Sequence, residues 1–227
     1  MPEIIDFKTP DGVKIVGDWY PSPTTIGVVI LLHMMTNDRK SWAPFQQELV
    51  KNNIASLAID LRGHGESVET KEGNKLDHKK FTDEEHQRYL VDAASAVQWL
   101  EAKKYSQDRM MVMGASIGSN IAIWMLEERP RLNGAVLLSP GNYRGIDAVE
   151  QADACKYHHA LWAAGSDSDD PEAYDTAKSV IERAPAYRKV FKPYKNSGHG
   201  IHLFTSDPKL MNELAVWIRE SLQATPS

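Results

Sequence analysis

The stretch Gly114-Ala115-Ser116-Ile117-Gly118 follows a largely apolar run at residues 109–113 and precedes a helical pattern at residues 119–128. This order predicts a strand, a sharp turn and a helix, with the serine on the turn. A serine at such a turn has a strained backbone and a raised hydroxyl, and the flanking glycines remove side chains that would collide there. We therefore predict that Ser116 is a nucleophile.

The composition is that of an ordinary α/β protein. The chain has 227 residues, of which 42% are hydrophobic and 25% charged, so it can bury a full core, and we expect a single domain over residues 1–227. The net charge of −5 and the scattered lysines and arginines argue against a nucleic-acid partner.

The N-terminus lacks a basic start and an apolar core, and no apolar run approaches the roughly 18 residues of a membrane span. We therefore expect a cytoplasmic protein with no membrane partner. The single cysteine, Cys155, is expected to be a buried thiol in a reducing compartment.

Strand and helix patterns alternate along most of the chain. Two antiparallel strands are expected at residues 4–8 and 13–20, because the turn sequence at residues 9–12 separates them. The later alternation predicts a mainly parallel sheet covered on both faces. The expected strands are residues 27–33, 54–60, 109–113, 134–139, 160–164 and 189–194, and the expected helices are residues 41–51, 83–103, 119–128, 171–183 and 208–222.

Four separate stretches resemble the α/β-hydrolase fold family of serine hydrolases. Residues 31–33, with Ser41-Trp42 after a loop, look like its strand and oxyanion loop; residues 60–67 are similar to its D-x-R-G-x-G-x-S segment. Residues 114–118 match its nucleophile elbow, and residues 195–200 look like the loop that carries its catalytic histidine. The resemblance implies an α/β-hydrolase fold, to which the N-terminal antiparallel hairpin belongs here, and we expect no cofactor.

The segment at residues 140–158 is short where many relatives insert a helical cap. It leaves room for a loop and one helix. We therefore expect a serine esterase type without a large cap domain and with an open cleft.

A serine hydroxyl needs a base to take its proton. The chain has eight histidines, and His199 is the expected base because two glycines flank it and because the family places its base after the last strand. His64 lies in a segment that the resemblance makes structural. His202 follows His199 at i+3, but no carboxylate or cysteine completes a metal site, so no metal is expected.

The acid that orients the histidine should follow the strand at residues 160–164, because the family order is nucleophile, acid, histidine. Aligned on the strand end, Asp167 takes the family position, while Asp169 and Asp170 stay open as alternatives. Asp60 also ends a strand, and we expect it to be structural, tied to Arg62.

The oxyanion formed during acyl transfer needs hydrogen-bond donors. The expected donors are the backbone N–H groups of Ile117 and Met34. Where many members have glycine after the histidine at position 33, this chain has Met34-Met35, which should narrow the acyl side of the pocket. Met35 and Tyr143 are the expected substrate-binding residues.

These features predict a serine carboxylesterase that cleaves small-molecule esters of short to medium acyl chains through an acyl-Ser116 intermediate. An acyltransferase or peptidase using the same triad is the first alternative. A non-catalytic binding protein on the hydrolase fold is the second, and the intact nucleophile, base and acid argue against it.

Overall fold

The computed structural model describes residues 2–224 and contains one large sheet. Its strand order is β1-β2-β4-β3-β5-β6-β9-β10, with β1, β2 and β4 paired antiparallel and the remaining neighbours parallel. The bounds are β1 (Glu3–Lys8), β2 (Lys14–Tyr20), β3 (Val28–Leu32), β4 (Ala55–Ile59), β5 (Met110–Ala115), β6 (Gly134–Leu138), β9 (His159–Ser166) and β10 (Ala186–Tyr194). The predicted α/β-hydrolase fold, with its N-terminal hairpin, is confirmed.

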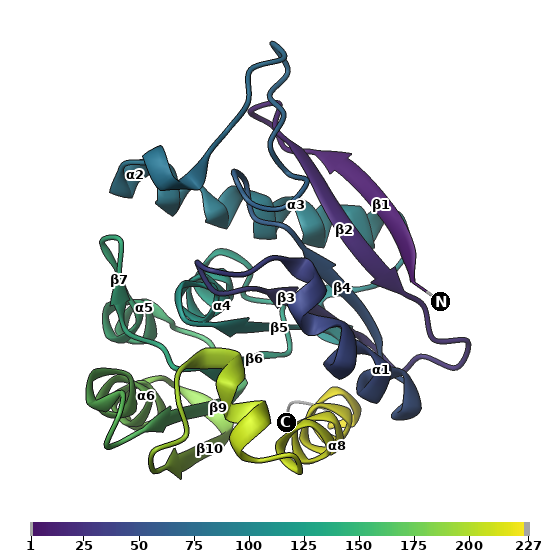
Figure 1. The fold of residues 1–227 in the computed structure, drawn as a ribbon. Helices are drawn as coiled ribbons and strands as arrows, with labels where there is room; N and C mark the ends of the chain where they lie inside the picture. The colour runs from purple at the N-terminus through teal and green to yellow at the C-terminus, as the bar shows by residue number, and fades with distance from the viewer. Residues whose placement is uncertain (1, 225–227) are drawn as a thin grey trace.

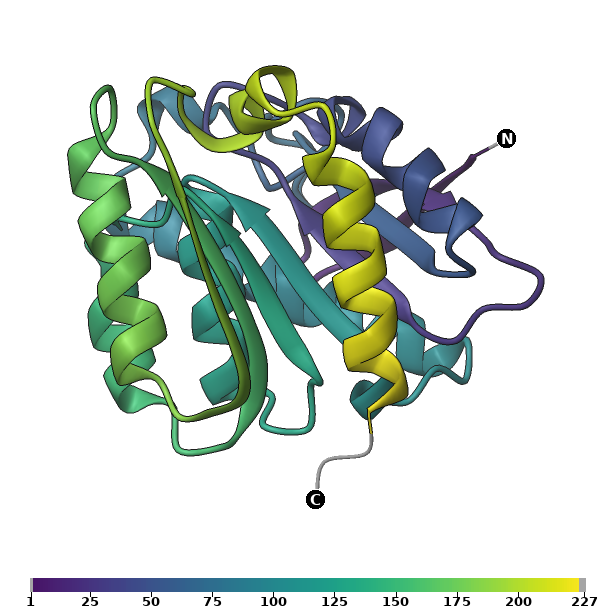
Figure 2. The same ribbon diagram turned by 90° about the horizontal axis from the view of Figure 1, so that it is seen from below.

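Helices cover both faces of this sheet (Figures 1 and 2). One hydrophobic cluster joins the sheet to α3, α4, α5 and α6, and a second joins it to α1, α7 and α8. No helix among residues 2–224 is both long enough and apolar enough to cross a membrane. The bounds are α1 (Ala43–Lys51), α2 (Asp83–Gln87), α3 (Tyr89–Ala102), α4 (Ile117–Glu128), α5 (Ala148–Ala154), α6 (Pro171–Arg183), α7 (Leu203–Ser206) and α8 (Leu210–Gln223).

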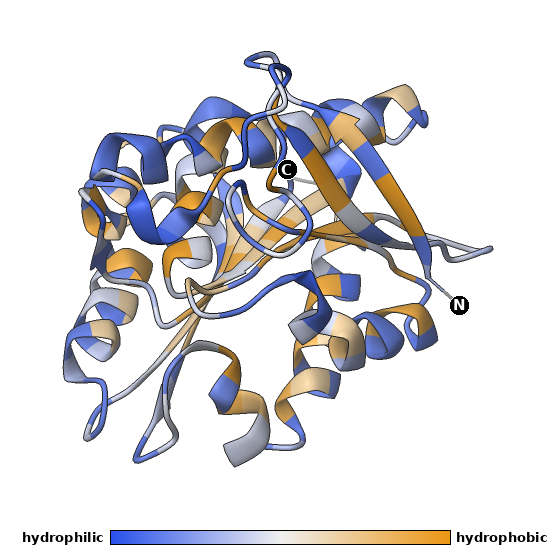
Figure 3. Cartoon of the chain, turned by 45° about the horizontal axis from the view of Figure 1, so that its top comes forward, coloured by the Kyte–Doolittle hydropathy of each residue, from blue (hydrophilic) through white to orange (hydrophobic). Residues whose placement is uncertain are grey.

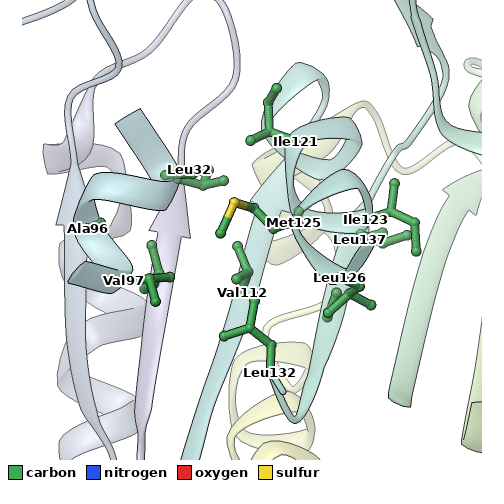
Figure 4. Packing of buried hydrophobic residues seen from close by; sticks show 14 of the residues in the cluster. Leu32, Ala96, Val97, Val112, Ile121, Ile123, Met125, Leu126, Leu132 and Leu137 are labelled. Carbon is green, nitrogen blue, oxygen red and sulfur yellow. The ribbon is translucent and has the colours of Figure 1, made fainter. Parts of the chain in front are cut away.

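The central strands are apolar because both of their faces are covered. Every residue of β3, β4, β5 and β6 is buried. Figure 4 shows side chains of α3 and α4, among them Val97 and Met125, packed against strand residues such as Val112 of β5. Along the helices, hydrophilic residues alternate with hydrophobic ones (Figure 3), as expected where one face of a helix packs on a sheet.

The expected helix at residues 83–103 is two helices, α2 and α3, separated at Arg88. Thr82 and Glu85 form a capping box at the start of α2. The Arg88 guanidinium donates to Asp11 in the N-terminal hairpin, at 2.6 Å from Nη2 to Oδ2. This contact joins residues far apart in sequence, so helical periodicity could not indicate the break.

The segment between β6 and β9 contains slightly more structure than expected. It holds α5 and a small hairpin of β7 (Asn142–Tyr143) and β8 (Ile146–Asp147). This is far too little chain for a large cap domain, so the expectation of a hydrolase fold without one is confirmed.

Asp60 is structural, but its partner is Arg39 rather than the expected Arg62. The backbone N–H of Arg39 donates to Asp60 Oδ1 at 2.8 Å, and its guanidinium also bonds to this carboxylate. Arg62 instead pairs with Asp92 at 2.7 Å. The prediction was wrong because the strand end directs the Asp60 carboxylate toward the loop after β3, whereas Arg62 lies against α3.

Three imidazole rings, those of His33, His64 and His78, pack against one another in series. The rings of His33 and His64 lie 4.7 Å apart edge to face, and those of His64 and His78 lie 3.7 Å apart and nearly parallel. Burial, together with the neighbouring histidines, lowers the pKa of His64 to about 2. Burial also lowers the pKa of His33. Both side chains are therefore neutral in the folded protein at neutral pH.

We expect this burial to make the folded state sensitive to acid. Below the ordinary pKa of 6.5, the unfolded chain binds a proton at His64 that the folded chain excludes, so stability falls as the pH falls. Each such histidine contributes about 1.4 kcal/mol per pH unit. Urea denaturation of wild type and His64→Gln at about pH 5.5 and 7.5 measures this loss, and the variant should lose less.

His158→Gln is the matched control, because His158 is exposed. It should keep the pH dependence of the wild-type protein. Equal pH dependence in His64→Gln and wild type would contradict the assignment.

Candidate active site

The predicted site residues gather at one edge of the sheet. Met34 follows β3, Ser116 follows β5, and His199 comes after β10. Because these strands are parallel, their carboxyl ends meet at the same edge, where ligands of open α/β sheets bind. The fold therefore brings together residues more than 160 positions apart in the sequence.

Ser116 lies on the turn predicted from the sequence. Its backbone has φ 54° and ψ −125°, between the end of β5 and the start of α4. Such a conformation costs a non-glycine residue about 1–3 kcal/mol. The turn is imposed by close packing, because a Cβ atom on Gly114 would overlap the Gly118 carbonyl and one on Gly118 would overlap the carbonyl of Leu32.

The predicted oxyanion donors lie on the two elements that this packing joins. Among the hydrogen bonds of residues 2–224, the backbone N–H groups of Met34 and Ile117 have no acceptor. The His33 ring fixes the loop, because its Nδ1 donates to the Met34 carbonyl at 2.8 Å while Nε2 accepts from the Leu61 N–H at 3.0 Å. These two N–H groups remain available to a ligand.

His199 lies beside the elbow, as predicted. A Cβ atom placed on the next residue, Gly200, would lie 3.2 Å from Met34 Sδ and 3.9 Å from the Ser116 nitrogen. The histidine loop, the oxyanion loop and the elbow are therefore in contact. Met34 is buried, so its side chain fills part of this junction.

The carboxylate that contacts His199 is Asp170, and the prediction of Asp167 was wrong on this point. His199 Nδ1 donates to Asp170 Oδ2 at 2.6 Å. Asp170 also precedes α6 as its N-cap residue, yet its side chain makes no capping bond there. The Asp170 carboxylate instead accepts the Nδ1–H of the imidazole. Because Nδ1 carries the proton, Nε2 of the neutral His199 ring is a proton acceptor.

The error has a simple structural cause. The expected strand ended at residue 164, but β9 continues through Ser166. The N–H of Asp167 extends the pairing with β10 by donating to the Tyr194 carbonyl at 3.0 Å, and its exposed side chain accepts from Ser168. Because β9 is two residues longer than expected, the turn that follows it begins later in the sequence. Asp170 therefore lies beside His199, where Asp167 was expected.

Two further side chains hold the histidine loop in place. Ser166 Oγ accepts from the Ser197 N–H at 2.9 Å, and Asp169 Oδ2 accepts from the Gly198 N–H at 2.7 Å. Asp169, an alternative for the acid, therefore positions the loop rather than the ring. The sequence offered no signal for Ser166 beyond its closeness to the acidic loop.

Ser139 and Tyr143 support the base from the other side. Ser139 Oγ accepts from the Gly200 N–H at 2.9 Å, and Tyr143 packs its ring edge to face against His199 with centroids 6.0 Å apart. The Tyr143 hydroxyl donates to the Ser139 carbonyl at 3.3 Å, and burial raises its pKa. Tyr143 thus lies at the site, and sequence analysis missed Ser139, whose left-handed φ of 54° was not foreseeable.

Met35 is half-buried and lies farther along the oxyanion loop. The Tyr89 hydroxyl donates to its sulfur at 3.9 Å. Within residues 2–224, no group of three or more histidine, cysteine or acidic side chains is arranged to hold a metal ion.

The assembled site contains the parts that acyl transfer requires. Ser116 supplies a hydroxyl on a strained turn, His199 a proton acceptor oriented by Asp170, and two backbone N–H groups a place for negative charge. This arrangement can take a proton from the serine and return it to a leaving group.

Comparison with known proteins gives the same fold. Esterase Pf2001 of Pyrococcus furiosus is 20% identical over 98% of this chain and 92% of that chain, with a TM-score of 0.78. The α/β hydrolase GrgF of Penicillium sp. sh18 is 11% identical over 99% and 100%, with a TM-score of 0.80. An esterase domain from Rhodothermus marinus is 14% identical over 97% and 99%, with a TM-score of 0.70.

No curated protein matched the sequence. The family model described as "Serine aminopeptidase, S33" matches residues 23–147. This range is more than half of the chain and includes both the oxyanion loop and Ser116. The chain therefore belongs to the serine aminopeptidase, S33, family of α/β hydrolases.

Proposed function

We propose that this protein is a serine hydrolase that cleaves carboxylic esters of short to medium acyl chains through an acyl-Ser116 intermediate. The observation that carries the proposal is the 2.6 Å bond from His199 to Asp170 beside the strained Ser116 turn. A loop histidine with a merely structural role would not need a dedicated carboxylate together with a serine at a positive φ.

The proposed reaction has two acyl-transfer steps. His199 Nε2 takes the Ser116 proton as Oγ attacks the ester carbonyl, and the N–H groups of Met34 and Ile117 stabilise the oxyanion. The imidazolium then protonates the leaving alkoxide as the C–O bond breaks. In the second step His199 takes a proton from water, the hydroxide attacks the acyl-serine, and Ser116 recovers its proton as the acid leaves. Asp170 stabilises the imidazolium in both steps.

The size of the acyl group follows from what surrounds the turn. Met34 is buried against the histidine loop, and Met35 is half-buried next to it. Each buried CH₂ contributes about 0.8 kcal/mol until the pocket is full. Met34 and Met35 fill space that a glycine would leave open to the acyl chain. The binding free energy should therefore stop increasing once the acyl chain reaches short to medium length.

Amide hydrolysis is the second candidate, because the matching family model is described as a serine aminopeptidase. The same acyl-Ser116 intermediate would form from an amide, with His199 protonating a leaving amine. Comparing p-nitrophenyl esters with aminoacyl p-nitroanilides separates the two: the ester proposal expects the higher kcat/KM with the esters.

The nucleophile is tested by Ser116→Ala. Removing one hydroxyl at a site that is 9% exposed disturbs little packing, so the variant should fold. It should lose p-nitrophenyl ester turnover and fluorophosphonate labelling, because both require Oγ. Ser95→Ala is a matched control, because Ser95 is also a buried serine but lies in α3, and this variant should still be labelled. Wild-type turnover by a folded Ser116→Ala protein would sink the mechanism.

The acid is tested by comparing Asp170→Asn with Asp167→Asn. Asparagine at 170 can hold the ring in the wrong tautomer and does not stabilise an imidazolium, so kcat should fall by about 10³–10⁴-fold. Asp167→Asn should change kcat less than about threefold, because that side chain faces solvent. Steady-state kinetics on p-nitrophenyl butanoate measures both, and the reverse ranking would reassign the acid to Asp167.

A further inference from the structure

A cavity of about 790 Å³ lies beside the oxyanion loop. One wall is the stretch from Met35 to Asp38, and the other comes from residues 63–65 and 77–79. The second wall belongs to the long segment between β4 and α2 in Figure 1. The volume is in the range of small-molecule sites.

Most of the residues that line this cavity have polar side chains. Met35 is the one apolar side chain among the described residues that line it. Asp38 and Asp77 each use one carboxylate oxygen to accept a backbone N–H, from Lys40 at 2.8 Å and from Lys79 at 3.1 Å. Neither carboxylate forms an ion pair with any residue from 2 to 224, so each keeps a free acceptor oxygen.

The lining also includes residues with donor groups. Lys79 is one of them, and its ammonium group has no ion-pair partner in the described part of the chain; Asn37 has an amide. A hydroxyl group both donates and accepts, so it suits walls that mix carboxylates with an ammonium and an amide. An apolar ligand would bury these polar atoms without hydrogen-bond partners, which costs binding free energy.

The cavity borders the loop that carries a proposed oxyanion donor. Met35 lines the cavity and directly follows Met34, whose N–H is that donor. His78 on the opposite wall stacks on His64, which packs against His33, and His33 in turn holds the Met34 carbonyl. A part of the substrate that extends from Ser116 past Met35 would therefore enter this cavity.

We propose that this cavity binds the alcohol portion of the substrate and that this portion is a neutral, hydroxyl-rich group such as a sugar or other polyol. The inference rests on the proposed esterase function and specifies its substrate class. The acyl group lies on the Met34 side, and the polar alcohol lies between Asp38 and Asp77.

The test compares two butanoate esters with the same acyl group and alcohols of similar size: the ester of the primary hydroxyl of glucose, and cyclohexylmethyl butanoate. The ratio of their kcat/KM values should favour the glucose ester by about tenfold or more, because two hydrogen bonds to charged groups are gained. In the double variant Asp38→Asn/Asp77→Asn, each asparagine can still accept the backbone N–H bond that the aspartate accepted, since asparagine also caps helices. This variant should lower the ratio of kcat/KM values about tenfold.

Lys79→Ala tests the same cavity if the double variant fails to fold, and it should also lower the ratio. Its matched control is Lys80→Ala, because Lys80 is equally exposed but does not line the cavity. A wild-type ratio at or below one, or a ratio that none of the cavity variants changes, would overturn the assignment. If neither ester is hydrolysed and Ser116 takes no fluorophosphonate label, the esterase proposal itself fails.

Discussion

The contact between β3, β5 and the start of α4 is the constraint on which the site depends. There is no room for a side chain at Gly114 or Gly118, so α4 begins directly against the strand ends. The chain can make this contact only by placing Ser116 at φ 54°. The buried strands of the sheet supply the packing that offsets this strain, and the Ile117 N–H is left at a helix start, where it has no internal acceptor.

The second requirement is a histidine held at a fixed distance from that turn. Side chains at the ends of two strands accept hydrogen bonds from the four consecutive residues 197–200: residue 139 after β6, and residues 166, 169 and 170 at the end of β9. A glycine-containing loop would otherwise be mobile. Because these anchors come from β6 and β9, the position of His199 is a property of the whole sheet rather than of its own loop.

Local sequence patterns predicted the sheet, most helices and the turn at Ser116, because apolar runs, turn residues and glycine spacing act over a few positions. Long-range contacts were not predictable in this way. Arg88, where the expected helix is interrupted, contacts Asp11 of the N-terminal hairpin, and the partner of Asp60 proved to be Arg39. The carboxylate that contacts His199 is that of Asp170 and not Asp167, because pairing with β10 lengthens β9, a tertiary effect that residue identity does not indicate.

The central claim is that Ser116 becomes covalently acylated and that Asp170 makes this possible through His199. Rapid-quench mass spectrometry of the enzyme mixed with p-nitrophenyl butanoate tests it directly. The account predicts a mass increase of one butanoyl group, located by peptide mapping on the fragment that contains Ser116 and formed far more slowly in Asp170→Asn. Ester hydrolysis with no acylated fragment at any quench time, or an acyl group on another residue, would contradict it.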